Sequence, residues 1–202
     1  MTGISREWPN ALADPPGAVS MGSPGAWRHS HLVLLGLPGA GKSTVGPIVA
    51  DALGREFVDL DREIERRGRR SISDIFAAQG ERAFRTLERA LSLELLAAAR
   101  SPIVLAPGGG WVEDPENRGL LGAGSIAVYL RVSPTVAVTR LGTETVTRPL
   151  LAGGDPEQKL RELLSRREPL YVQSQYTLSV DSMTPGEVAL SIVALASGEF
   201  AD

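Results

Sequence analysis

The chain has 202 residues, of which 43% are hydrophobic and 22% charged, and a formal net charge of −3. These values are typical of one soluble globular domain and argue against a general binder of nucleic acid or anionic membranes, which would normally be basic. The absence of cysteine excludes disulfides and thiolate chemistry, and with only His29 and His31 a histidine metal site is not expected.

Residues 1–30 are rich in proline and glycine and have no apolar period, so they are predicted to form a disordered leader. They lack the basic start and apolar middle of a secretory signal. No run of 18 apolar residues occurs, so no membrane span is predicted and the expected location is the cytoplasm.

From residue 31 onward, short apolar runs alternate with amphipathic segments. In chain order they predict a strand at 31–36, helix at 45–53, strand at 56–60, helices at 71–76 and 81–99, strand at 102–106, helix at 115–121, strand at 125–132, helices at 134–141 and 156–168, strand at 176–181 and helix at 185–197. This alternation predicts an α/β domain with a mostly parallel sheet and helices on both faces. Ligands of such sheets bind at the carboxyl ends of the strands, where every motif below lies.

The segment "GLPGAGKST" (36–44) fits the P-loop pattern G-x-x-x-x-G-K-[ST] between a predicted strand and a predicted helix. Its glycines let backbone N–H groups face a phosphate, and the helix N-terminus adds positive potential. Lys42 is expected to reach the β- and γ-phosphates and Ser43 to bind Mg²⁺. The motif therefore predicts a nucleoside triphosphate site, with a plain glycine-rich turn as the alternative.

The segment "DLD" (59–61) supplies two acidic side chains after the second predicted strand. The third strand ends in "IVLAPGGG" without an acid, so Asp59 is the expected carboxylate for Mg²⁺. Asp61 is placed to hold an alcohol that attacks the γ-phosphate, or to accept its proton. Spacing alone also fits N-capping by Asp61, since aspartate favours helix starts.

Three glycines (108–110) and three arginines complete the candidate set. Gly108, Gly109 and Gly110 permit close approach of the backbone to a small ligand. Arg148 lies in a glycine-rich stretch typical of a mobile loop and is a candidate for closing over phosphates. Singly, the arginines have simpler explanations: Arg85 as a solvated side chain or partner of Glu88, and Arg167 as a favourable charge at a helix end.

Taken together and in this order, the motifs resemble those of the shikimate kinase family. The resemblance rests on "GLPGAGKST" (36–44), "DLD" (59–61), "SISDIFAAQGERAFRTLE" (71–88), "GGG" (108–110), "TRPLLAG" (147–153) and "RREPLY" (166–171). It covers about residues 31 to 197. Trp111, directly after the glycines, and Pro107, directly before them, depart from the family pattern.

The resemblance implies an α/β P-loop kinase fold with a five-stranded parallel sheet flanked by helices. Within a domain at 31–202 it implies a substrate-binding subdomain at 62–95 and a mobile lid at 142–155. It further implies transfer of the γ-phosphate of ATP to the 3-hydroxyl of shikimate, in chorismate and aromatic amino acid biosynthesis. A monomer that binds shikimate, ATP and Mg²⁺, but neither nucleic acid nor membrane, is expected.

The resemblance also implies a role for each matching residue. Asp61, Lys42 and Arg148 are the expected catalytic residues, and Ser43 and Asp59 the expected metal ligands. Substrate binding is expected of Asp61, Arg85, Gly108, Gly109, Gly110 and Arg167. Nucleotide binding is expected of Gly39, Ala40, Gly41, Lys42, Ser43, Thr44, Arg140 and Arg148.

Two alternatives remain open at the level of sequence. Another small-molecule P-loop kinase, acting on gluconate or a nucleoside monophosphate, would keep Lys42 and Ser43 without needing arginines arranged for a carboxylate. A non-catalytic nucleotide-binding module is the other alternative, against which the presence of Lys42, Asp61 and Arg148 argues.

Overall fold

The computed structural model describes residues 26–97, 99, 101–122, 124–143, 145, 151 and 153–197. Five strands form one sheet within these residues: β1 (His31–Leu35), β2 (Glu56–Asp59), β3 (Ile103–Ala106), β4 (Ser125–Arg131) and β5 (Tyr176–Ser179). All pair in parallel, in the order β2-β3-β1-β4-β5. The predicted five-stranded parallel sheet is therefore confirmed.

The central strand β1 is the most deeply buried part of the sheet. Residues 32–35 are at most 2% exposed, and Leu34 aligns with Val128 of β4. Near-continuous apolar runs of this kind are typical of parallel strands covered on both faces. Because β1 leads directly into the P-loop motif, the most deeply buried strand of the sheet positions that motif.

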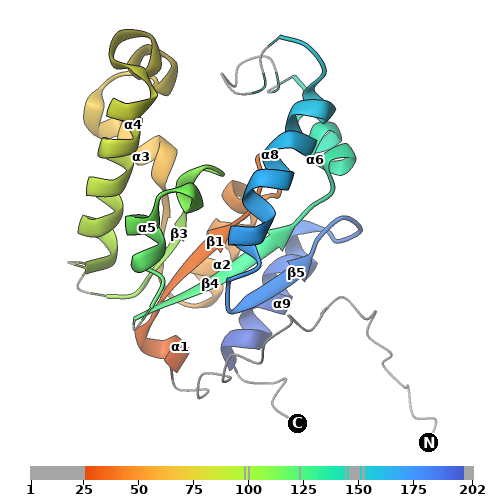
Figure 1. Ribbon diagram of the computed structural model, residues 1–202. Helices are drawn as coiled ribbons and strands as arrows, with labels where there is room; N and C mark the ends of the chain where they lie inside the picture. Colours follow the sequence, from red (N-terminus) through yellow and green to blue (C-terminus); the bar gives the residue numbers. More distant parts are fainter. Residues whose placement is uncertain are drawn as a thin grey trace, which may run out of the picture.

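Helices cover both faces of the sheet and extend beyond the carboxyl ends of its strands (Figure 1). They are α1 (Ala26–His29), α2 (Lys42–Ala52), α3 (Leu60–Gly68), α4 (Ile72–Ala97), α5 (Pro115–Gly119), α6 (Pro134–Leu141), α8 (Pro156–Tyr171) and α9 (Pro185–Ser197), with a 3₁₀ turn η1 (Trp111–Glu113). α2 packs against α9, α3 against α4, and α6 against α8. None of the helices in the described part of the chain combines the length and apolar character needed to cross a membrane.

The two helices predicted at 71–76 and 81–99 form one element, α4, with an interruption at Gly80. Its φ of 78° and ψ of 171° are not helical, and a positive φ favours glycine. Ser71 caps the start, donating to Asp74 Oδ2 (2.7 Å) and accepting from the Asp74 N–H (3.0 Å). The break predicted from the sequence is therefore present, at Gly80, between two helices that share the label α4.

The predicted leader at 1–30 extends too far, because residues 26–30 belong to the folded domain. Trp27 in α1 is 2% exposed, and its ring lies 5.4 Å from that of Tyr176. Arg55 donates to the carbonyl oxygens of Trp27 and Ser30. Residues 1–25 lie outside the described residues.

Candidate active site

The P-loop motif curves between β1 and α2 at the carboxyl end of the central strand. Gly39 has a φ of 82° and Gly41 of 93°, conformations that favour glycine. A Cβ on Gly39 would lie 2.6 Å from the carbonyl oxygen of Ala137, so this position has no room for a side chain. The loop and the helix N-terminus after it are suited to an anion.

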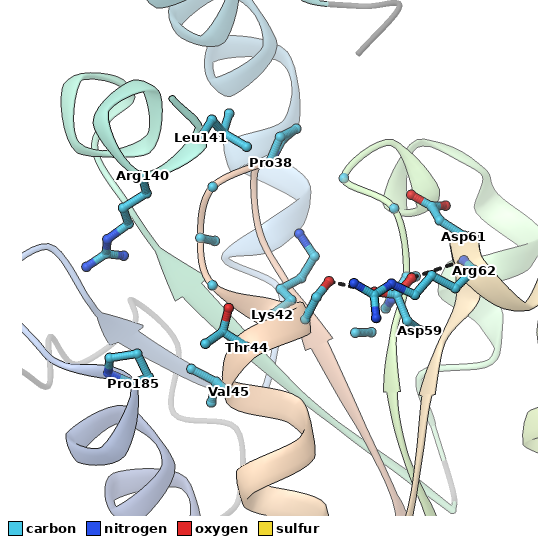
Figure 2. Close-up of a pocket in the computed structure, with 18 of the residues that line it drawn as sticks. Pro38, Lys42, Thr44, Val45, Asp59, Asp61, Arg62, Arg140, Leu141 and Pro185 are labelled. Atoms are coloured by element: carbon cyan, nitrogen blue, oxygen red, sulfur yellow. Dashed lines mark hydrogen bonds between the residues drawn. The ribbon is translucent and has the colours of Figure 1, made fainter. Parts of the chain in front are cut away.

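The motif lines a cavity of about 710 Å³, which we call the P-loop cavity; residues 39–44 all contribute to it. Arg140 and Pro185 lie at one end and Asp59 and Asp61 at the other, with Lys42 between them (Figure 2). Lys42 Nζ donates to the carbonyl oxygens of Gly36 (2.7 Å) and Leu37 (3.0 Å). The cavity thus carries a fixed cation next to the backbone of the loop.

Asp59 connects this loop to α3. Its Oδ2 accepts a hydrogen bond from Ser43 Oγ (2.5 Å), and its Oδ1 accepts from the N–H of Arg62 (3.2 Å), which makes Asp59 the N-cap of α3 (Figure 2). The capping role considered for Asp61 therefore belongs to Asp59, and Asp61 lies in the first turn of the helix.

The oxygens of Ser43 and Asp59 fit the preference of Mg²⁺ for hard oxygen ligands. No cluster of three or more His, Asp or Glu side chains suited to a metal occurs among the residues that the structure describes. Mg²⁺ usually takes one or two protein ligands and completes its shell with phosphate and water. The donor set present is consistent with that mode.

A second cavity of about 230 Å³, which we call the arginine cavity, adjoins the first and shares Asp61, Gly108 and Gly109 with it. Arg85 from α4 and Arg167 from α8 line it, with Phe76, Phe84 and Leu151 among the apolar residues of its wall. The structure therefore brings together the predicted acid, glycines and two of the three predicted arginines.

The glycine segment, Gly108–Gly110, lies directly against both guanidinium groups. A Cβ on Gly110 would lie 2.7 Å from Arg85 Nη2 and 3.0 Å from Arg167 Nη2. A Cβ on Gly108 would lie 3.0 Å from Asp61 Oδ1. Glycine at these positions lets the backbone and the charged groups share one small space.

Arg85 is held by carboxylates from its own helix. Its Nη1 lies 2.8 Å from Glu88 Oε2 and its Nη2 lies 3.1 Å from Glu81 Oε1. Glu88 is fully buried, and this burial raises its pKa to about 7, although the positive charge of Arg85 opposes the rise. The sequence indicates Glu88 as a partner of Arg85, and this pairing is present, but the place of Glu88 in the cavity could not be predicted from it.

Arg167 is only 2% exposed, and its counter-charge comes from η1. Glu113 Oε2 lies 2.9 Å from Arg167 Nε and 2.8 Å from Nη2. One turn further along α8, the Tyr171 hydroxyl donates to the carbonyl oxygen of Gly109 (2.5 Å). Both Glu113 and Tyr171 were missed as site residues, although Tyr171 ends the quoted "RREPLY" segment.

Trp111 does not crowd the cavity. It is fully buried, its Nε1 donates to Ser92 Oγ on α4 (2.7 Å), and it is absent from the described lining of both cavities. The Trp111 carbonyl oxygen accepts from Asn117 Nδ2 (3.0 Å). Trp111, which departs from the family pattern, therefore anchors the end of the glycine segment to Ser92 and Asn117.

The two predicted nucleotide-binding arginines differ in whether the structure describes them. Arg148 lies outside the described residues, as does much of the predicted lid. Arg140 Nη2 donates to the carbonyl oxygens of Val180 (2.6 Å) and Asp181 (3.3 Å), so its side chain lies against the segment between β5 and α9. It remains part of the wall of the P-loop cavity.

The class of protein follows from this arrangement. A parallel sheet carries a P-loop at the end of its central strand, and an adjoining cavity offers an acid and two arginines. These features define a P-loop phosphotransferase with a small anionic acceptor.

Comparison with known proteins narrows this class. The shikimate kinase family model matches residues 38–196. Curated shikimate kinases are similar: one from Mycobacterium avium is 48% identical over 165 residues, 80% of this chain and 90% of that protein. One from Thermobifida fusca is 47% identical over 159 residues, 78% of this chain and 89% of that protein. The chain belongs to the shikimate kinase family.

A solved structure supports the same conclusion. The shikimate kinase from Acinetobacter baumannii in complex with shikimate matches with a TM-score of 0.79 at 39% identity, covering 87% of this chain and 98% of that chain. The predicted family and fold are therefore confirmed, and the chain is a shikimate kinase-type enzyme. Family membership argues against the gluconate kinase, nucleotide monophosphate kinase and non-catalytic alternatives.

Proposed function

We propose that the chain transfers the γ-phosphate of ATP to the 3-hydroxyl of shikimate, giving shikimate 3-phosphate and ADP, in chorismate and aromatic amino acid biosynthesis. The observation that carries this proposal is the junction of the two cavities at Asp61 and the glycine segment. One cavity has the features that bind a triphosphate, and the other has arginines for a carboxylate. An acceptor hydroxyl at the junction of the two cavities would lie next to the γ-phosphate that is transferred.

ATP is assigned to the P-loop cavity. The backbone from Gly39 to Thr44 would hold its phosphates, and Lys42 would neutralise negative charge on the β- and γ-phosphates. Arg140 and Pro185 lie at the end assigned to the adenine. Ser43 and Asp59 would hold Mg²⁺, which when bound neutralises charge on the phosphate oxygens.

Shikimate is assigned to the arginine cavity. Its carboxylate would be bound by Arg85 and Arg167, since guanidinium groups donate to carboxylates in a planar fork. The glycine segment permits the ring to approach the backbone, and Phe76 and Phe84 provide an apolar wall.

Asp61 is assigned as the catalytic base. As the 3-hydroxyl oxygen attacks the γ-phosphorus, its proton passes to the Asp61 carboxylate and ADP leaves. Asp61 lines both cavities, which supports contact with the acceptor on one side and the phosphate on the other.

We further propose a substrate-binding subdomain, a mobile lid, a location and an oligomeric state for the chain. The region at 62–95 would act as the substrate-binding subdomain and 142–155 as a lid that brings Arg148 over the phosphates and excludes water. Leu151, the described lid residue in the arginine cavity, supports such closure. We further propose a cytoplasmic monomer without nucleic acid or membrane partners, consistent with the net charge of −3.

A coupled assay of ADP release tests the reaction. With ATP and Mg²⁺, shikimate should stimulate ADP release, while gluconate and AMP should not. Release with gluconate or AMP and none with shikimate would point to another small-molecule kinase. ATP binding by calorimetry without transfer to any of the three would point to a non-catalytic module.

A further inference from the structure

The carboxylate of Glu113 is the feature of the arginine cavity that the proposed reaction leaves without a role. Glu113 lies in η1, three residues after Gly110, and is outside the described lining of the cavity. Its carboxylate contacts Arg167 through the Nε and Nη2 atoms of the guanidinium group. We propose that Glu113 is a positioning residue, which orients Arg167 and so sets affinity for the substrate carboxylate.

The geometry of the ion pair supports orientation rather than simple neutralisation. One oxygen, Oε2, bonds both Nε and Nη2, so the contact takes the side edge of the planar guanidinium and fixes the plane of the group. Both terminal nitrogens still lie against the glycine segment, since a Cβ on Gly109 would lie 3.4 Å from Nη1 and a Cβ on Gly110 would lie 3.0 Å from Nη2. Glu113 thus leaves Nη1, at the edge of Arg167 that faces the glycine segment, to donate to the acceptor carboxylate.

Because Arg167 is buried, its ion pair with Glu113 is important for the position of its side chain. Arg167 is 2% exposed, whereas the Glu113 side chain is 38% exposed. A buried guanidinium without its counter-charge would be strongly disfavoured and would turn toward water or another acceptor. Loss of Glu113 should therefore change where Arg167 points.

The turn that carries Glu113 is itself held by three sets of hydrogen bonds. The Glu113 N–H donates to Gly110 O (3.0 Å), and Arg118 Nη1 donates to the carbonyl oxygens of Val112 (2.7 Å) and Glu113 (3.1 Å). Trp111 ties the same turn to Ser92 on α4. Through Glu113, Arg167 on α8 is therefore held in a fixed position relative to α4 and the glycine segment. Arg85 and Arg167 both lie against the backbone of that segment.

The inference rests on the proposed function, and steady-state kinetics of Glu113→Gln and Glu113→Ala test it. We expect the KM for shikimate to rise about tenfold in Glu113→Ala and less in Glu113→Gln, which keeps an acceptor oxygen, while the KM for ATP stays within about twofold. The matched control is Glu116→Gln. Glu116 lies in the neighbouring helix α5, and the substitution removes its exposed ion pair with Arg89 of α4.

A double-mutant cycle with Arg167→Lys separates positioning from general damage. If Glu113 acts through Arg167, Glu113→Ala should add little to the loss of shikimate affinity in that background. Additive losses, an unchanged KM for shikimate, or equal rises for both substrates would overturn the inference. Failure of the proposed reaction itself would appear separately, as a wild-type protein without shikimate-dependent ADP release; calorimetric shikimate binding by the same variants would then decide the role of Glu113.

Discussion

The P-loop cavity and the arginine cavity meet at Asp61 and the glycine segment, but their polar groups come from different sources. In the P-loop cavity, the residues assigned to the phosphates, 39–44, are consecutive and offer backbone N–H groups and one helix N-terminus. In the arginine cavity, the charged side chains come from α3, α4 and α8, and each arginine has its own carboxylate partner. The fold of the loop itself positions these backbone groups, whereas a buried charge requires a partner of opposite charge.

This difference assigns different tasks to the two cavities. A preorganised backbone loop binds any triphosphate in much the same way, so it provides general affinity. A constellation of buried ion pairs distinguishes a carboxylate acceptor from a neutral one, so it provides specificity. Substitutions in the P-loop cavity should therefore affect the use of ATP, and substitutions in the arginine cavity should affect the affinity for shikimate. Substitution of Asp61, which lines both cavities, should instead lower turnover.

Asp61→Asn is expected to have the largest effect, because Asp61 lies at the junction and is the assigned base. Turnover should fall about a thousandfold, in the range typical of loss of a general base. Binding of ATP, measured by calorimetry, should change little, since the P-loop remains intact. Near-normal turnover in this variant would show that the acceptor proton leaves by another route.

Lys42→Ala is expected to come next and to act on the P-loop side alone. Loss of its charge should lower turnover about two hundredfold, comparable to removal of one group that stabilises the transition state. Shikimate affinity, measured by calorimetry without nucleotide, should remain close to that of the wild type. A parallel loss of shikimate affinity would show that the cavities are not independent.

Arg85→Ala should act mainly on the arginine side. The KM for shikimate should rise about tenfold to a hundredfold with the KM for ATP little changed, as expected for loss of a charge-assisted hydrogen bond. Arg89→Ala is the matched control, since Arg89 lies one turn further along α4 and pairs with Glu116 outside the cavity. Equal behaviour of the two variants would remove Arg85 from the substrate site.

The same difference explains what could be predicted from the sequence. The P-loop is contiguous, so its pattern and its place between a strand and a helix identify it without tertiary information. The bounds of α6 and α9, 134–141 and 185–197, also follow from local periodicity and proline at the helix start.

The partners in the arginine cavity could not be found in this way. Glu113 and Arg167 are 54 residues apart, and the Trp111–Ser92 hydrogen bond depends on how η1 packs on α4. Trp27 lies in a segment without apolar period, and its burial depends on Tyr176, far along the chain. Each of these contacts is fixed by the packing of distant segments, which no local pattern encodes.

Glu88→Gln is expected to have the smallest effect on kinetics, because Arg85 keeps its contact with Glu81 (3.1 Å), and its main effect should be on stability. Burial raises the pKa of Glu88 to about 7 in the folded chain, above the usual 4.5, even with Arg85 and Arg167 nearby. The folded state therefore holds this proton more tightly than the unfolded state, and the contribution to stability is complete below about pH 4.5 and lost as the pH rises through 7.

Urea unfolding between pH 5 and pH 8 measures this contribution. The free energy of unfolding of the wild type should carry a component that falls by at most about 1.4 kcal/mol per pH unit, which Glu88→Gln should remove. Glu94→Gln is the control, because Arg67 lowers the pKa of Glu94 and that group titrates below the window. Identical pH profiles for Glu88→Gln and the wild type would mean that Glu88 stays ionised beside Arg85. Glu88 would then be a charged partner of Arg85 throughout this pH range.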